Sequence, residues 1–259
     1  MNKFSIETWI PQRWDHIVGN ENLVEHFKDT LKAMLAGDTK GLNTMILGPS
    51  GTGKTATTTF FVSCLLCDTP DPVTLNPCNV CQPCIRRSGQ IGQLGLDTIH
   101  LAGKFHFIPI DCADCNADDI RMLLKDVHSY AEIRIVYLDE VHRLHRPNSP
   151  LEDMLLIPTR RTDVMWIGSL ISAGDLKIEF QKRFMHVYTE LPTVESLSLW
   201  LANRCKEWGI VVDGAKTLIL LAEKANCVPG DTLQVLARAY KKKPRVLEKK
   251  LVEKHVFVK

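Results

Sequence analysis

The chain has 259 residues, of which 45% are hydrophobic and 24% are charged, as is typical of a soluble globular protein. No apolar run approaches the roughly 18 residues of a membrane span, and the opening "MNKFSIETWIPQRW" lacks the apolar core of a signal peptide. We therefore expect a cytoplasmic protein with no membrane partner, in which clustered cysteines more often bind metal than form disulfides.

The chain alternates apolar strands with helices over its first two thirds. Strands are predicted at 43–48, 105–111, 133–140, 163–171 and 185–191, and helices at 54–66, at 117–131 and before 184. Such an alternation indicates an α/β fold with a parallel sheet covered by helices on both faces. From Pro192 onward only helical patterns remain, at 193–209, 213–226 and 229–242.

This change of pattern predicts a nucleotide-binding domain over 1–191, a small all-helical lid domain over 192–241, and a basic C-terminal helix or tail over 242–259. The net charge of +2 is unevenly distributed along the chain. The segment from Arg238 to Lys259 has nine Lys/Arg and two Glu, whereas the preceding 237 residues have a net charge of −5. Such a tail is either a solvated helix face or a nucleic-acid contact. With Tyr240 as the sole aromatic beside the lysines, it suits the phosphate backbone of DNA and not its bases.

The stretch "GPSGTGKT" matches the phosphate-binding pattern G-x-x-x-x-G-K-[ST] and lies between a predicted strand and a predicted helix. It comprises Gly48, Pro49, Ser50, Gly51, Thr52, Gly53, Lys54 and Thr55. Backbone N–H groups of such a loop surround phosphates, assisted by the helix dipole. We expect ATP here, with Lys54 on the β- and γ-phosphates and Thr55 as a ligand of Mg²⁺.

Two carboxylates end the predicted strand "IVYLDE". Asp139 and Glu140 would meet the phosphate loop at the carboxyl edge of the sheet. Asp139 would hold Mg²⁺ and Glu140 would act as the general base toward water, although acidic residues at strand ends are also common solvated turns.

Four cysteines follow the phosphate-loop helix, namely Cys67, Cys78, Cys81 and Cys84. Four thiolates can bind Zn²⁺ tetrahedrally, and such a site is structural because no coordination position stays open. Reduced core cysteines are the alternative, which the prolines of this stretch disfavour. We predict a zinc module inserted at 67–90.

Cys112 and Cys115 form a further C-x-x-C, which we interpret as ordinary thiols, with redox sensitivity as the alternative.

The order of phosphate loop, cysteine insert, "YLDEVHRL", strand and "QKRF" resembles the AAA+ clamp-loader ATPases, nearest to the gamma/tau subunits of bacterial DNA polymerase III. The opening "PQRWDHIVGNENLVEHF" is similar to the adenine-side segment of that family, which implies that Val18 and Gly19 lie against the base. The resemblance extends from about residue 9 to about residue 240.

The resemblance implies roles for two more residues. Arg183 of "FQKRF" matches an arginine that reaches the ATP of the neighbouring subunit, and it implies an oligomer of AAA+ subunits. Ser169, or Ser172 one loop further on, stands where the family has a polar residue that senses the γ-phosphate. Packing of Ser169 and a surface cap formed by Arg183 are the structural alternatives.

The sequence also departs from the family. Leu233 replaces an arginine of the lid, the stretch "LLIPTRR" replaces an acidic segment, and "KKKPRVLEKKLVEKHVFVK" follows the lid where clamp-loader subunits have a helical collar domain. The resemblance implies an ATPase that loads a sliding clamp on primed DNA. Two alternatives stay open: an AAA+ ATPase with another client, such as a helicase loader or a recombination or transposition regulator, and an ATP-gated binding module with little turnover.

Overall fold

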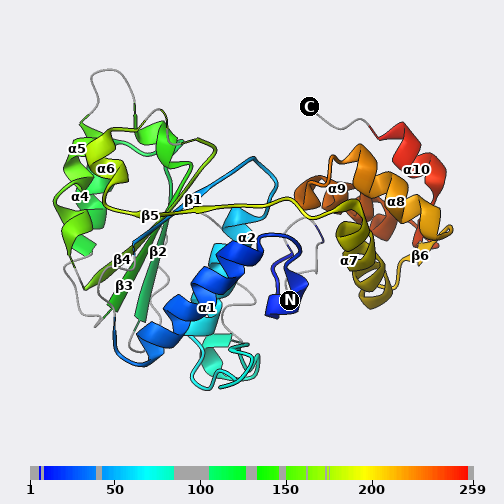
Figure 1. The fold of residues 1–259 in the computed structure, drawn as a ribbon, viewed down its shortest axis with the longest axis horizontal. Helices are drawn as coiled ribbons and strands as arrows, with labels where there is room; N and C mark the ends of the chain where they lie inside the picture. The colour runs from blue at the N-terminus through cyan, green and yellow to red at the C-terminus, as the bar shows by residue number, and fades with distance from the viewer. Residues whose placement is uncertain are drawn as a thin grey trace.

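The computed structural model describes residues 9–38, 43–84, 105–126, 133–145, 150–161, 163–172 and 176–255, together with Ile6 and Gly174. Its centre is a five-stranded parallel sheet in the order β2-β3-β4-β1-β5 (Figure 1). The strands are β1 (Thr44–Leu47), β2 (Phe105–Asp111), β3 (Ile133–Asp139), β4 (Val164–Leu170) and β5 (Met185–Tyr188). Every predicted strand is present, to within three residues at each end.

Helices cover both faces of this sheet because successive side chains of each strand point to opposite faces. On β3, Ile135 and Tyr137 join the cluster formed with α1 (Glu21–Leu35) and α2 (Lys54–Leu65). Val136 and Leu138 join the cluster on the other face. That face carries α4 (Ala117–Asp126), α5 (Leu151–Leu155) and α6 (Ile178–Gln181), with short 3-10 turns η2 (Val141–Leu144) and η3 (Pro158–Arg160) between them.

Helix α2 is buried along nearly its whole length, from Thr57 to Leu65. Its threonines have a weak helix propensity, which burial between the sheet and α1 overrides. The polar side chain of Ser63 is satisfied inside the helix, where it donates a 2.7 Å hydrogen bond to the Thr59 carbonyl. The helix can thus accept several small polar residues in an apolar setting.

Helix α1 was not among the predicted elements, although the sequence carries a signal for it. Leu23, Phe27, Leu31 and Met34 recur at helical spacing and are all completely buried. The Phe27 ring stacks on Phe61 of α2 with ring centroids 4.3 Å apart. This stacked pair fixes the two helices side by side on one face of the sheet.

The C-terminal part contains the predicted helices as α7 (Val194–Glu207), α8 (Ala215–Lys224) and α9 (Pro229–Lys241). They share a separate buried cluster and lie to the right of the sheet in Figure 1. In place of a plain helix or tail after 241, the chain forms β7 (Val246–Leu247) and α10 (Lys249–Lys254). Strand β7 pairs with β6 (Val211–Val212), and completely buried Leu247 and Val252 anchor the segment in the same cluster.

Among the described residues, no helix combines the length and the apolar character needed to cross a membrane.

Candidate nucleotide-binding site and cysteine cluster

A cavity of about 340 Å³ lies at the carboxyl edge of the sheet and contains most of the predicted site residues. Its walls come from the N-terminal segment around residues 9–20, the phosphate loop with the start of α2, the ends of β3 and β4, and helices α7 and α9. It is therefore bounded both by the sheet and by the helical part. Ligands of open α/β sheets bind at such an edge.

The phosphate loop has the backbone conformation that its glycines allow. Gly51 and Gly53 have φ of +78° and +92°, a region in which side chains other than glycine are strained. Residues Ser50 to Thr55 line the cavity at the start of α2. Such a loop is suited to an anion.

Lys54 begins α2, and its ammonium group donates hydrogen bonds of 2.7 Å to the carbonyls of Gly48 and Pro49. Burial lowers the pKa of Lys54 from its ordinary value of 10.5, while Asp139 and Glu140 oppose that shift. The cation thus lies against the loop, facing the cavity together with the two carboxylates.

Asp139 at the end of β3 accepts a 3.0 Å hydrogen bond from the Thr55 hydroxyl. Ser169 of β4 donates to the other carboxylate oxygen of Asp139. The buried Tyr137 hydroxyl lies 3.0 Å from Asp139 Oδ1 and 3.1 Å from the oxygens of both Thr55 and Ser169. Three segments distant in sequence therefore meet in one polar cluster. Ser172 lies beyond β4 and does not line the cavity.

Glu140 follows Asp139 in a left-handed conformation with φ of +52°. Its carboxylate accepts a hydrogen bond of 3.2 Å from Arg143 Nε, and both side chains are about half exposed. Glu140 therefore lines the cavity with its carboxylate accessible to solvent. Arg143, which the sequence analysis did not include, is its ion-pair partner.

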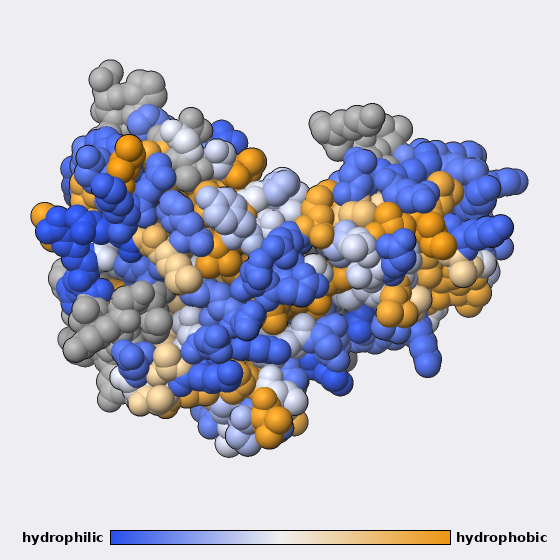
Figure 2. Space-filling model, viewed as in Figure 1, coloured by the Kyte–Doolittle hydropathy of each residue, from blue (hydrophilic) through white to orange (hydrophobic). Residues whose placement is uncertain are grey.

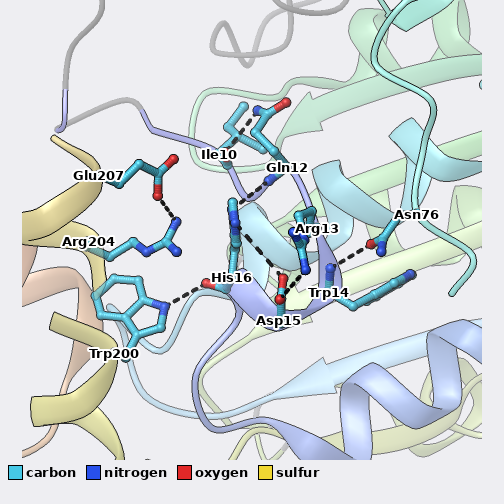
Figure 3. A network of polar contacts seen from close by, with 10 residues as sticks. All are labelled: Ile10, Gln12, Arg13, Trp14, Asp15, His16, Asn76, Trp200, Arg204 and Glu207. Carbon is cyan, nitrogen blue, oxygen red and sulfur yellow. Dashed lines mark hydrogen bonds and ion pairs between the residues drawn. The ribbon is translucent and has the colours of Figure 1, made fainter. Parts of the chain in front are cut away.

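The wall away from the phosphate loop is aromatic. Trp9 stacks on His16 with centroids 5.9 Å apart and meets Trp200 of α7 edge-on at 6.0 Å. The Trp200 indole N–H donates to the His16 carbonyl at 2.8 Å. Figure 3 shows Trp200 and Arg204 pointing from α7 toward the N-terminal segment. A planar apolar group such as a purine base fits this wall.

Of the two residues predicted to face the base, Val18 lines the cavity and Gly19 does not. Gly19, with φ of +65°, packs against the chain that leaves β5, so that a Cβ there would lie 2.7 Å from the Glu190 carbonyl oxygen. The adjacent Asn20 is buried and joins this chain to the phosphate loop. Its side chain donates to the Thr52 carbonyl at 2.7 Å and accepts from the Glu190 N–H at 2.9 Å.

Helix α9 closes the cavity from the helical part through Pro229, Gly230 and Leu233. Leu233 is the residue that replaces the lid arginine expected from the resemblance, so an apolar side chain borders the cavity there. Trp200 contacts His16, and Gly230 contacts Gly51. These two contacts could not be anticipated from the sequence, because more than 140 residues separate the partners of each.

Arg183 does not line this cavity. It lies between α6 and β5, where its carbonyl accepts a 3.3 Å hydrogen bond from the Asn43 side chain. Its side chain is partly buried, and within the described part of the chain its Nε has no hydrogen-bond partner. Arg183 is therefore not part of the cavity of its own chain, and a role at another chain is a proposal.

The four cysteines of the insert converge. The sulfur atoms of Cys67, Cys78, Cys81 and Cys84 all lie within 4.8 Å of one another. Zn–S bonds of about 2.3 Å in a tetrahedron place sulfurs about 3.8 Å apart, close to the 4.0 Å between Cys81 and Cys67. Backbone N–H donation from Val80 is the largest of the effects that lower the pKa of Cys78 to about 6, which favours the thiolate. This donor set fits Zn²⁺. Residues 85–90 of the predicted module lie outside the described residues.

The cysteine loop is attached to the segment that lines the cavity. The Trp14 indole N–H donates to the Leu75 carbonyl at 3.1 Å, and the Trp14 backbone N–H donates to the Asn76 side chain at 2.9 Å. The Trp14 ring meets Phe60 of α2 edge-on with centroids 4.8 Å apart. The other pair, Cys112 and Cys115, is buried in the core on the opposite face of the sheet.

No family model and no curated protein matches the chain, but solved structures do. RuvB of Thermotoga maritima, a Holliday junction branch migration motor, is similar with a TM-score of 0.65 and 15% identity, over 94% of this chain and 70% of that one. Two mutants of the same RuvB give TM-scores of 0.65 and 0.64 at 16% and 15% identity, over 94% and 95% of this chain and 71% of each of theirs. Identity this low establishes fold alone. The predicted fold class is confirmed: the chain has the AAA+ fold, to which a cluster of four cysteines is added.

Proposed function

We propose that this chain is an ATP-hydrolysing AAA+ subunit of a clamp-loader-like complex, which uses ATP to load a sliding clamp on primed DNA. The observation that carries the ATPase part is the meeting of Lys54, Thr55, Asp139 and Glu140 in one cavity beside an aromatic wall. The clamp-loader part rests on the order of motifs in the sequence, above all the cysteine loop after α2.

Each residue of the cavity then has a defined task. Lys54 neutralises the β- and γ-phosphates, and the Thr55 hydroxyl with the Asp139 carboxylate holds Mg²⁺. The bound cation supplies charge that stabilises the transferring phosphoryl group. Glu140 takes a proton from the attacking water, and release from Arg143 would free its carboxylate for this step. Ser169 stands beside Asp139, where its hydroxyl oxygen would contact the γ-phosphate.

Completion of the site requires a second chain in this proposal. Arg183 lies away from the cavity of its own chain, so its guanidinium is available to the phosphates bound by a neighbouring subunit. Its side chain would stabilise charge on the phosphates in trans, as arginine fingers do. The functional form is accordingly an oligomer of AAA+ subunits, made of this chain alone or of this chain with others.

DNA would be contacted through its phosphate backbone by the basic end of the helical part. Lys241, Lys242, Lys243 and Arg245 are exposed there, and the Arg245 guanidinium lies 3.9 Å from the Tyr240 ring centroid. Figure 2 shows hydrophilic residues along the upper right edge of the helical part, with hydrophobic residues below them. Because Tyr240 is covered by Arg245, base stacking is not expected at this surface.

A second candidate is a motor that acts on branched DNA. The observation in its favour is the fold similarity to RuvB, the branch migration motor. Both candidates hydrolyse ATP in the same way. They differ in the form of DNA that stimulates hydrolysis.

The test is the steady-state ATPase rate of the purified chain alone, with primed DNA plus a sliding clamp, and with a four-way junction, while the mass in solution is recorded with ATP. Stimulation by primed DNA and clamp supports the clamp-loader proposal, and stimulation by the junction alone replaces it with the second candidate. Absence of turnover under every condition, with nucleotide bound, would leave an ATP-gated binding module.

Glu140→Gln provides the matched control for this experiment. The change removes the general base while keeping size and hydrogen bonding, so we expect nucleotide binding to persist and turnover to fall by about a hundredfold or more. Turnover that survives the substitution would show that a contaminating ATPase, or another base, was being measured.

A further inference from the structure

Tyr137 places a hydroxyl behind the wall of the candidate nucleotide site, at the edge of the apolar core. It stands two residues before Asp139 on β3, so both side chains point to the same face of the sheet. The side chain is completely buried, and its ring packs in the cluster with α1 and α2. An ordinary apolar residue at this position would fill the core equally well, so the hydroxyl group calls for an explanation.

The Tyr137 hydroxyl is the point where three segments of the site meet. It lies within 3.1 Å of oxygens of Thr55, Asp139 and Ser169, which come from α2, β3 and β4 respectively. Two of these partners are the proposed magnesium ligands, and the third is the proposed contact of the γ-phosphate.

The Tyr137 hydroxyl has one proton, and oxygens of Asp139, Thr55 and Ser169 all lie within hydrogen-bond distance to accept it. Thr55 and Ser169 each donate a hydroxyl proton to the carboxylate, and the Glu140 backbone N–H donates to it at 3.1 Å. With Tyr137, three of these groups meet Asp139 Oδ1, whereas Thr55 alone bonds Oδ2, so that Oδ2 keeps a lone pair. Because the Thr55 proton is directed at Asp139, the lone pairs of the Thr55 oxygen remain to face the cavity.

We propose that Tyr137 is a positioning residue for magnesium-dependent nucleotide binding. Its hydroxyl joins Thr55, Asp139 and Ser169 into one hydrogen-bonded unit, so that the magnesium ligands and the γ-phosphate contact keep a fixed spacing. The inference rests on the proposed ATPase function and deepens it. It predicts that removing the Tyr137 hydroxyl while keeping the aromatic ring reduces the gain in ATP affinity that Mg²⁺ provides. The affinity for nucleotide without Mg²⁺ should change less.

The experiment compares Tyr137→Phe with the parent chain, both carrying Glu140→Gln so that ATP is not consumed. The affinities for ATP and for ADP are measured by calorimetry in excess Mg²⁺ and in EDTA, and thermal unfolding of each protein is recorded. Tyr188→Phe is the matched control, because it removes the same oxygen from a side chain that is 63% exposed on β5.

We expect the gain in ATP affinity that Mg²⁺ provides to fall about tenfold in Tyr137→Phe, the scale of one hydrogen bond to a charged group. Affinity in EDTA should be little changed, and the loss should be larger for ATP than for ADP because Ser169 faces the γ-phosphate. Tyr188→Phe should behave as the parent.

An unchanged magnesium response in Tyr137→Phe overturns the inference while leaving the ATPase proposal intact. Equal weakening with and without Mg²⁺, accompanied by a lower melting temperature, also overturns it, because that result describes a packing role alone. A parent chain that binds neither nucleotide would instead remove the proposed function itself. The two failures are therefore distinguishable.

Discussion

The backbone N–H of Gly230, in the first turn of α9, donates a 2.9 Å hydrogen bond to the carbonyl oxygen of Gly51 in the phosphate loop. A Cβ at position 230 would lie 2.9 Å from that same oxygen, and a Cβ at position 51 would lie 2.6 Å from Val228. The helical part thus rests directly on the loop that is expected to bind phosphates. Any movement of α9 must change the surroundings of the nucleotide.

Gly230→Ala should weaken nucleotide binding about tenfold, since the added methyl group pushes α9 away from the loop at the cost of a typical overpacking substitution. Titration calorimetry with ATP measures the effect. Gly174→Ala is the control, because a Cβ there meets only the Ser172 side chain at 3.7 Å. Unaltered affinity in Gly230→Ala would mean that the contact is not kept when nucleotide binds.

Arg183→Ala should lower turnover by roughly a thousandfold without weakening nucleotide binding, as expected for an arginine that acts on the phosphates of another chain. Lys182→Ala, at the exposed neighbouring position, should have little effect. Mixing Arg183→Ala with Glu140→Gln subunits should restore part of the activity, because each supplies what the other lacks. If the mixture stays as inactive as its components, the trans assignment is wrong.

The cysteine loop should contain about one Zn²⁺ per chain, measured by atomic emission. Cys81→Ser should lose the metal and lower the melting temperature, because the insert has little apolar core of its own. It should also weaken ATP binding, since Leu75 and Asn76 of the loop hold Trp14 in the segment that lines the cavity. Cys227→Ser, outside the cluster, is the control. A zinc content well below one per chain would refute the zinc site. Normal ATP affinity in Cys81→Ser would refute the effect of the cysteine loop on the cavity.

The interface between the N-terminal segment and α7 should make stability depend on pH through His16. Burial, followed by the positive charge of Arg204, lowers its pKa below the ordinary value of 6.5, while Glu207 and Asp15 oppose the shift and Arg13 adds to it. Below pH 6.5 the unfolded chain then binds more protons than the folded one. Stability is therefore full above 6.5 and is lost as the pH falls through the lower pKa of the folded state.

His16→Gln should flatten this loss below pH 6.5 without abolishing it, because burial also lowers the pKa of His26 and of His255. Urea unfolding at a series of pH values measures the slope. His186→Gln removes a histidine from β5, far from this interface, and serves as the comparison. A slope equal to that of the parent would show that His16 does not contribute to the acid sensitivity.

Local sequence was sufficient to predict the sheet, the phosphate loop and the set of four cysteines. Alternation of apolar strands with helices specifies a parallel sheet, and the spacing of glycines before Lys54 specifies a loop of a particular conformation. The position of Tyr137 could also have been found, because a residue two before Asp139 on a strand must share its face. These features depend on neighbours within a few residues along the chain.

The tertiary structure alone decided which distant residues complete the site. Trp200 reaches His16, Gly230 rests on Gly51, and Asn20 joins the phosphate loop to the chain after β5, each across many residues of sequence. Nothing in local periodicity encodes such pairs, because they arise where the helical part packs against the edge of the sheet. The basic segment after residue 241 likewise became part of a packed cluster because Leu247 and Val252 bury themselves there. Burial of those two side chains, which depends on where β6 and α8 lie, outweighs the charge that the segment displays in the sequence.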